Sequence, residues 1–160
     1  MKQVTLRLLG KPLRPVDLDD IVLQHAHLLR RTSDLAVDTT GVSGGQVVGN
    51  DEALGRMIEN LTSNARRHAR SRVAFRVQEQ GARVELVVSD DGNGIAAADR
   101  DRVLERFTRL DDAREIDRSG AGLGLAIVAE IVERHGGTIT IEDGTDAPGA
   151  RFVVLLPAAG

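Results

Sequence analysis

Three glycines alternate with other residues directly before an apolar, helix-forming stretch. Gly120, Gly122 and Gly124 lie within Ser119–Val128, and the residues after Gly124 are aliphatic. Glycine lets backbone amides approach an anion closely, and the start of a helix directs unpaired N–H groups and a positive dipole end to the same point. The spacing is therefore typical of a phosphate-binding turn, with a tight connection before a helix as the alternative interpretation.

A second group of polar side chains recurs with helical spacing. Asn60 and Asn64 are four residues apart, and Arg67 and His68 follow on the same face, away from an apolar stripe. An amide oxygen on this face is able to ligate a hard cation, because Mg²⁺ bound to a nucleotide takes only one or two protein oxygens. A solvated polar face is the other interpretation.

Asp90 follows an apolar, strand-like stretch and precedes Gly92 and Gly94. A carboxylate held there accepts a hydrogen bond from an exocyclic amine such as N6 of adenine, whereas guanine O6 would oppose it with a second acceptor. In this interpretation Asp90 selects the base. The stretch Asp-Asp-Gly-Asn-Gly also suits an ordinary polar turn.

These candidates need elements to hold them, and the apolar periodicity predicts where those elements are. Leu54, Ile58, Leu61 and Ala65 recur as the buried stripe of a helix, and Asp17 is placed to cap an earlier one. Gln80-Gly81 suits the turn of a β-hairpin. The patterns predict helices over 16–31, 51–69 and 123–135, and strands over 34–39, 46–48, 72–78, 83–89, 138–142 and 150–156.

The polar segment 96–120 contains one short predicted helix, over 100–107, and is otherwise a long loop. Loops of this length in compact domains are commonly functional lids or disordered segments. Over residues 105–118 the loop carries Arg106, Arg109, Arg114 and Arg118 among five acidic residues, so at most one or two of these arginines are expected to bind phosphate.

Composition limits the classes of partner. The 160 residues have a net charge of −3, so an anion site has to be built from local residues. Aromatic residues make up 2% of the chain, which argues against stacking on single-stranded nucleic acid. Cysteine is absent, which excludes thiolate chemistry, and no apolar run is long enough to cross a bilayer. We therefore expect no nucleic-acid partner and no direct membrane contact.

Four motifs occur in a defined order: Asn60–Ala65, Asp90–Ile95, Glu105–Asp111 and Gly120–Val128. They resemble the N, G1, F and G2 boxes of the ATP-binding catalytic domain of bacterial two-component sensor histidine kinases, in the GHKL superfamily. The resemblance implies a two-layer α/β sandwich, with three helices on one face of a mixed, mostly antiparallel sheet. It also implies one domain over 1–160, with 1–15 as a lead-in and 96–120 as an ATP lid.

By the same resemblance, ATP and Mg²⁺ are the expected cofactors. Asn64 is expected to hold Mg²⁺ with support from Asn60, Arg67 to reach phosphate, His68 to lie along the adenine, and Asp90 to bind its N6 group. Arg109 is expected at the γ-phosphate, which makes Asn60, Asn64 and Arg109 the catalytic candidates. The remaining expected ATP contacts are Gly92, Gly94, Ile95, Gly120, Gly122, Leu123, Gly124 and Leu125.

Related ATPases of the superfamily activate water with a Glu four residues before the metal-binding Asn, and here that position is Asn60. This difference favours transfer of the γ-phosphoryl group to a protein side chain. None of the four histidines has the sequence context of the family's acceptor, and His25, His27 and His135 are interpreted as ordinary surface or half-buried residues.

The acceptor is therefore expected on a separate dimerisation domain of a parent kinase, with a response regulator downstream. The isolated domain is expected to be a monomeric cytoplasmic unit, and the parent a membrane-anchored homodimer. A serine kinase of the anti-sigma-factor type and a nucleotide-binding module without catalysis are the alternatives.

Overall fold

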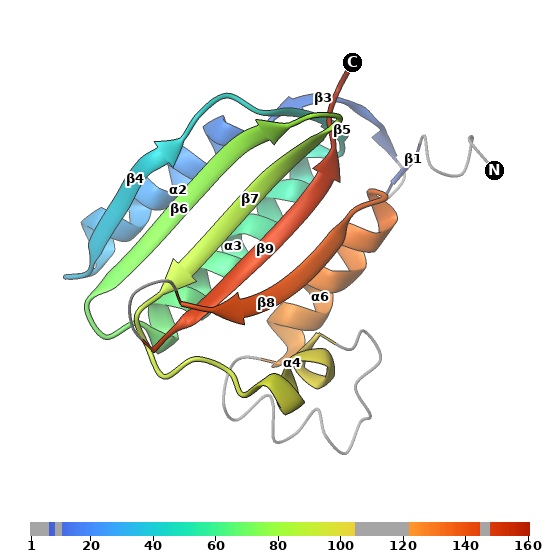
Figure 1. Ribbon diagram of the computed structural model, residues 1–160. Coiled ribbons are helices and arrows are strands. Elements are labelled where there is room, and N and C mark those ends of the chain that lie inside the picture. Colours follow the sequence, from blue (N-terminus) through green and yellow to red (C-terminus); the bar gives the residue numbers. More distant parts are fainter. Residues whose placement is uncertain (1–6, 9–10, 105–121, 145–147) are drawn as a thin grey trace.

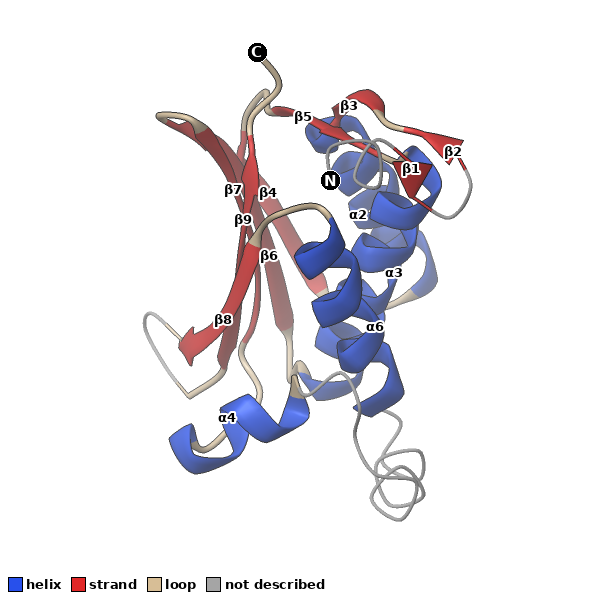
Figure 2. Cartoon of the chain, turned by 90° about the vertical axis from the view of Figure 1, so that its right-hand side faces the viewer, coloured by secondary structure: helices blue, strands red, loops and turns tan. Residues whose placement is uncertain are grey.

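The chain forms two layers, a five-stranded sheet and a layer of helices on one of its faces. The computed structural model describes residues 7–8, 11–104, 122–144 and 148–160. Figure 2 shows helices α2, α3 and α6 on one side of the sheet and the short α4 below it. The predicted sandwich is confirmed. The helices are α2 (Leu18–Thr32), α3 (Asp51–His68), α4 (Ala97–Val103) and α6 (Gly122–Arg134).

The main sheet has the strand order β4-β6-β7-β9-β8 (Figure 1). Its strands are β4 (Ala36–Val42), β6 (Arg72–Gln80), β7 (Arg83–Asp90), β8 (Thr138–Asp143) and β9 (Ala150–Pro157). Only the β4–β6 pair is parallel. Gly81, at φ 61°, makes the predicted hairpin turn between β6 and β7. The sheet is therefore mixed and mostly antiparallel, as predicted.

The core lies between the sheet and the helices because the strands alternate. Val73, Phe75 and Val77 of β6 are buried on one face, and the cross-strand partner of Phe75 is the equally buried Val88 of β7. The predicted α3 stripe is buried throughout and meets this face. Burial of a Val, Leu or Phe side chain stabilises a fold by about 1.5–3 kcal/mol each, so this layer contact is the main source of stability.

None of the helices in the described part of the chain lies on the opposite face of the sheet (Figure 1). Val87 and Val153 lie paired on that face, yet they are only 3% and 7% exposed. Arg76, directly across from Val87, lies 3.6 Å from Glu85 through its Nε. The aliphatic part of such a long side chain covers apolar surface while its charged end remains in water.

The N-terminal part differs from the prediction. Arg14–Asp17 forms a strand, β3, that pairs antiparallel with β5 (Gln46–Gly49), although the residues before 16 were expected to be only a lead-in. Two-residue strands β1 (Arg7–Leu8) and β2 (Lys11–Pro12) pair before it. The predicted Asp17 cap is wrong, because the carboxylate accepts a hydrogen bond from Gln46 at 3.0 Å and makes no cap bond.

The remaining element predictions hold within a few residues, except that α4 begins at Ala97, earlier than the expected residue 100. The end of that predicted helix, residues 105–107, lies outside the described residues. Within the described ranges, no helix is both long enough and apolar enough to span a bilayer.

His135 joins the C-terminal end of α6 to the start of α3. Its Nδ1 lies 2.7 Å from the Ile131 carbonyl, and its Nε2 lies 3.2 Å from the Asn50 backbone nitrogen. This places the proton on Nδ1, which donates to the carbonyl, and leaves Nε2 to accept from Asn50. Asn50 in turn caps α3, accepting from the Ala53 N–H at 2.9 Å. His135 is 8% exposed, so the expected surface or half-buried position is wrong.

Candidate functional site

Asn64 lies on α3 with an amide oxygen that has no hydrogen-bond partner among the described residues. The residue is only 2% exposed, and its Oδ1 is buried. The alternative interpretation, in which Asn64 lies on a solvated polar face, is therefore wrong for this residue, because that part of α3 is covered. An unpaired buried oxygen is costly, typically about 1–3 kcal/mol. Such an atom is suited to a ligand that supplies the missing partner.

Asn60, one turn earlier, contacts the start of α6. Its Nδ2 donates to the Arg56 carbonyl at 2.9 Å, which turns its Oδ1 toward Gly124. A Cβ added to Gly124 would lie 3.1 Å from that Oδ1, so a side chain there would press on the amide. The fold thus brings the glycine run to the Asn-bearing helix, from a position 64 residues away in the chain.

Three further residues of the predicted phosphate-binding run, Gly122, Leu123 and Leu125, lie at the start of α6. Gly122 and Leu123 form part of the first turn of α6. Leu125 is 1% exposed and belongs to the hydrophobic core, so only its backbone is available to a ligand. Gly120 and Arg109 lie outside the described residues, and their roles remain predictions.

Asp90 ends β7 and carries the second unpaired buried oxygen. It is 7% exposed; its Oδ1 accepts from the Gly92 N–H at 2.8 Å, while its Oδ2 has no partner among the described residues. Burial raises the pKa of Asp90 above its ordinary value, although the Gly92 amide opposes the shift. The free oxygen is an acceptor positioned for an N–H donor from a ligand.

The glycines of the loop after Asp90 are required by close contacts. A Cβ on Gly92 would lie 2.0 Å from the His68 carbonyl oxygen, so the loop rests directly on the end of α3. Gly94 has φ 78°, a conformation that favours glycine, and faces Gly149 before β9. A Cβ on Gly149 would in turn lie 2.1 Å from the Asp90 carbonyl oxygen. Asp90 is therefore held between α3 and the start of β9.

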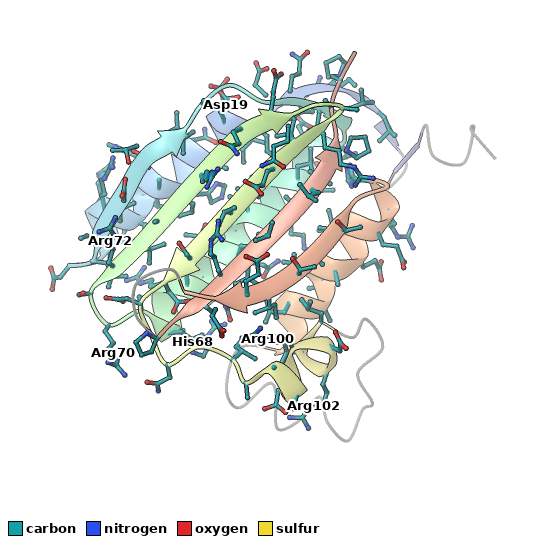
Figure 3. The ribbon with its side chains drawn as sticks, in the orientation of Figure 1. Asp19, His68, Arg70, Arg72, Arg100 and Arg102 are labelled. Carbon is teal, nitrogen blue, oxygen red and sulfur yellow. The ribbon has the colours of Figure 1, made fainter. Side chains whose placement is uncertain are left out.

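Arg67 and His68 end α3 as exposed residues. Figure 3 shows His68 and Arg70 near the end of the sheet from which the loop after β7 leaves. Arg67 and His68 thus lie one helical turn from the buried Asn64, at the edge of the same region. Their contacts to phosphate and base remain predictions.

Asp91 is a functional candidate that sequence reasoning missed. Its carboxylate accepts hydrogen bonds from residues 70–72, between α3 and β6. A second carboxylate in a polar turn gives no local signal of such a role. Only its position between Asp90 and Gly92 could have drawn attention to it.

Ile95 and Gly94 line a cavity of about 470 Å³ next to α4 and the turn between β8 and β9. The Arg100 Nε donates to the Ile95 carbonyl at 3.0 Å, and the Arg100 guanidinium pairs with Asp143, which also lines this cavity. Neither Asn64 nor Asp90 belongs to its lining. The cavity is therefore a neighbour of the two unpaired oxygens and does not contain them.

The donor set suits a nucleotide whose phosphates carry the metal. Among the described residues, no group of three or more His, Cys, Asp or Glu side chains could hold a metal ion. Asn64 Oδ1 is a hard oxygen ligand of the kind that Mg²⁺ accepts when phosphates and water fill its other positions. Asp90 Oδ2 is able to accept a hydrogen bond from an amine. The residues present thus fit a magnesium–adenine nucleotide, with each unpaired oxygen given a partner.

Comparison with known proteins agrees with this geometry. A family model described as histidine kinase-, DNA gyrase B- and HSP90-like ATPase matches residues 49–160. The chain is also 41% identical over 150 residues to the signal transduction histidine-protein kinase/phosphatase MprB of Mycolicibacterium smegmatis. That match covers 89% of this chain, which spans 30% of the length of the relative.

Two solved structures are similar in fold. A mycobacterial sensor histidine kinase MprB gives a TM-score of 0.76 at 34% identity, covering 91% of this chain and 97% of that one. The ATP-binding domain of PrrB from Mycobacterium tuberculosis also gives 0.76, at 29% identity, covering 94% of this chain and 100% of that one.

Proposed function

Because this chain belongs to the histidine kinase-, DNA gyrase B- and HSP90-like ATPase family, we propose that it binds Mg-ATP and transfers the γ-phosphoryl group to a histidine of a separate domain. The observation that carries the proposal is the pair of buried, unpartnered oxygens on Asn64 and Asp90. They come from different elements, α3 and β7, and the loop after Asp90 packs against the end of α3. One oxygen is suited to a metal and the other to an amine.

The roles follow from where each group lies. Asp90 Oδ2 would accept from adenine N6, with Oδ1 held by the Gly92 amide. Asn64 Oδ1 would ligate Mg²⁺, and Asn60 would support it from the preceding turn, beside the start of α6. Backbone amides in the first turn of α6, at Gly122 and Leu123, would face phosphate, as helix N-termini generally do.

Phosphoryl transfer requires positioning and charge neutralisation more than proton abstraction. Bound Mg²⁺ would supply neutralisation of the phosphate charge. The bond between the γ-phosphorus and the bridging oxygen would break and ADP would leave with the electron pair. A P–N bond would form to the unprotonated imidazole nitrogen, and the proton on the other ring nitrogen would pass to solvent. Asn60 occupies the position at which related ATPases carry a water-activating Glu, and an amide there supplies no base, which favours this transfer over hydrolysis.

The name of the MprB relative, a histidine-protein kinase/phosphatase, supports an acceptor histidine in a part of the parent that lies beyond this chain. We propose a dimerisation and phosphoacceptor domain as the direct partner and a response regulator as the next acceptor. The parent would be a membrane-anchored homodimer, with residues 1–160 as its cytoplasmic catalytic domain and 96–120 as the lid, bringing Arg109 and Gly120 to the triphosphate.

The test mixes this domain with the dimerisation domain of its own parent and with ATP labelled at the γ-phosphate. We expect label on the partner in an acid-labile form, as phosphohistidine. Acid-stable label on a partner serine would instead support the anti-sigma-factor type of kinase. Tight Mg-ATP binding without transfer to any partner would support a binding module.

The variant Asn64→Ala should lose Mg-dependent ATP binding and label transfer together. Thr62→Val is the matched control, because Thr62 is also buried on α3 but its hydroxyl already donates to the Ile58 carbonyl at 2.7 Å. Retained Mg-dependent binding in Asn64→Ala would remove the metal assignment.

A further inference from the structure

Asp91 accepts a dense set of hydrogen bonds from the connection between α3 and β6. Its Oδ1 accepts the backbone N–H groups of Arg70, Ser71 and Arg72 at 2.8, 3.0 and 3.1 Å. Its Oδ2 accepts the Ser71 hydroxyl at 2.6 Å and lies 3.2 Å from the Ser71 nitrogen. Hydrogen bonds to an ionised acceptor are among the stronger ones in proteins.

Two neighbouring contacts join the same segments. The Arg70 guanidinium donates to Asn93 Oδ1 at 2.7 Å, on the far side of Gly92 from Asp91. Gly92 itself lies against the His68 carbonyl, where a Cβ would be 2.0 Å away. Figure 3 places Arg70 and His68 at this same end of the fold. Residues 91–93 are thus attached to the end of α3 through bonds and packing at three successive positions.

The charge state of Asp91 is compatible with a permanent anchor. Burial acts to raise the pKa of Asp91, but the Ser71 hydroxyl and the amides of residues 70–72 together hold this pKa far below its ordinary value. The carboxylate therefore stays ionised throughout the physiological range. The pKa of Asp90, one residue earlier, is shifted in the opposite direction, because burial raises it.

These contacts set the relation between the two proposed recognition groups. Asn64 belongs to α3, whose end is held by residues 68–72, and Asp90 belongs to β7, whose end is held by residues 91–93. Asp91 connects the two ends directly, next in sequence to Asp90. A carboxylate that discriminates between an amine and a carbonyl on a base must be held within a few tenths of an ångström, because hydrogen bonds weaken steeply with misalignment.

We propose that Asp91 is a positioning residue that fixes Asp90 relative to α3 and so determines the preference of the site for adenine over guanine nucleotides. This inference rests on the proposed function, in which Asp90 accepts from the base. Asp91 itself touches no ligand, since its two oxygens are occupied by residues 70–72.

The experiment measures dissociation constants of Mg-ATP and Mg-GTP for the native domain, Asp91→Ala and Asp91→Asn. We expect Asp91→Ala to raise the ATP constant by about tenfold, the equivalent of one charge-assisted hydrogen bond, with a smaller change for GTP. Asp91→Asn should restore most of the ATP-to-GTP ratio, because its amide oxygen can take the Oδ1 position and receive all three backbone N–H groups.

The Val22→Ala variant is the control for lost stability, since Val22 is fully buried on α2, away from these contacts. It should unfold at lower temperature and keep the native ATP-to-GTP ratio. Ser71→Ala removes only the hydroxyl bond to Asp91 and should lower the ratio partway, which keeps the test valid if Asp91→Ala does not fold.

An unchanged ATP-to-GTP ratio in folded Asp91→Ala would overturn the inference. Where that variant does not fold, an unchanged ratio in Ser71→Ala would do so. A failure of Asp91→Asn to restore the ratio would also overturn it. A native domain that binds Mg-ATP but not in preference to Mg-GTP would overturn the base-reading role of Asp90 and this inference with it. A native domain that binds no nucleotide would overturn the proposed function itself, so the failures are distinguishable.

Discussion

Replacing Asn64 by leucine should make the nucleotide-free domain more stable and at the same time remove its response to Mg-ATP. The side chains have similar size, and Asn64 is 2% exposed with an unpartnered Oδ1 among the described residues. Leucine removes a desolvation cost of about 1–3 kcal/mol. For a chain of this length, each kcal/mol raises the unfolding temperature by about 2–4 °C.

Mg-ATP should act in the opposite sense on the two proteins. A ligand at a concentration 100 times its dissociation constant stabilises the folded state by about 2.7 kcal/mol. The native domain should gain this amount, whereas Asn64→Leu should gain little, because the metal loses its protein oxygen. Thermal unfolding with and without Mg-ATP, followed by circular dichroism, measures both effects in one pair of scans.

Thr62→Val is again the comparison, since it exchanges a polar for an apolar side chain on the same helix. In the native protein the Thr62 hydroxyl already has a hydrogen-bond partner, so its removal relieves no unpaired atom. It should show no stabilisation without ligand and a full shift with Mg-ATP. The reasoning is refuted if Asn64→Leu is less stable than the native domain without nucleotide, or if it keeps the full Mg-ATP shift.

Three other predictions follow from single residues. Asp90→Asn should lose the preference for ATP over GTP in competition binding, and an unchanged base preference would contradict this. Because burial raises the native pKa of Asp90, the native domain should lose stability as pH rises above 3.8, and Asp90→Asn should remove that loss. Burial lowers the pKa of His135 below 6.5, so the contribution of His135 to the free energy of unfolding is fully present above pH 6.5 and is lost as pH falls. Urea unfolding from pH about 8 to about 5 should show a decline in this free energy that His135→Gln reduces, and an equal decline in both proteins would exclude His135 as the cause. Gly55→Ala should raise the free energy of unfolding by about 0.5–1 kcal/mol, because Gly55 lies within α3 with nothing near its Cβ position. Gly137→Ala should lower the free energy of unfolding, since a Cβ there would lie 2.2 Å from the Leu155 carbonyl oxygen.

Elements defined by local pattern could be predicted from the sequence. The stripe from Leu54 to Ala65 repeats at helical spacing, and α3 begins and ends within one residue of the prediction. Strand β3 could not be predicted, because its only reason to be extended is the pairing of Pro15 and its neighbours with β5, more than 30 residues away. Pro15 by itself argues against a strand except at an edge.

The identity of the site residues was accessible from sequence motifs, whereas their environment was not. Asn64 has the spacing of an exposed helix face, and its burial depends on what the rest of the fold lays over α3. Asp91 resembles any turn carboxylate until the connection after α3 is placed beside it. Both properties arise from contacts between distant segments, which no periodicity records.

Strand β9 is the last strand in chain order, yet it lies between β7 and β8 in the sheet. A ribosome that makes the chain from its N-terminus releases the β6–β7 hairpin long before residues 150–157 exist, so one edge of β7 stays open during synthesis. Gly149, which closes against Asp90, arrives with the same strand. A nascent chain that stops before residue 149 should therefore lack the contact that holds Asp90, and the proposed base-binding region would form only once Gly149 has been added.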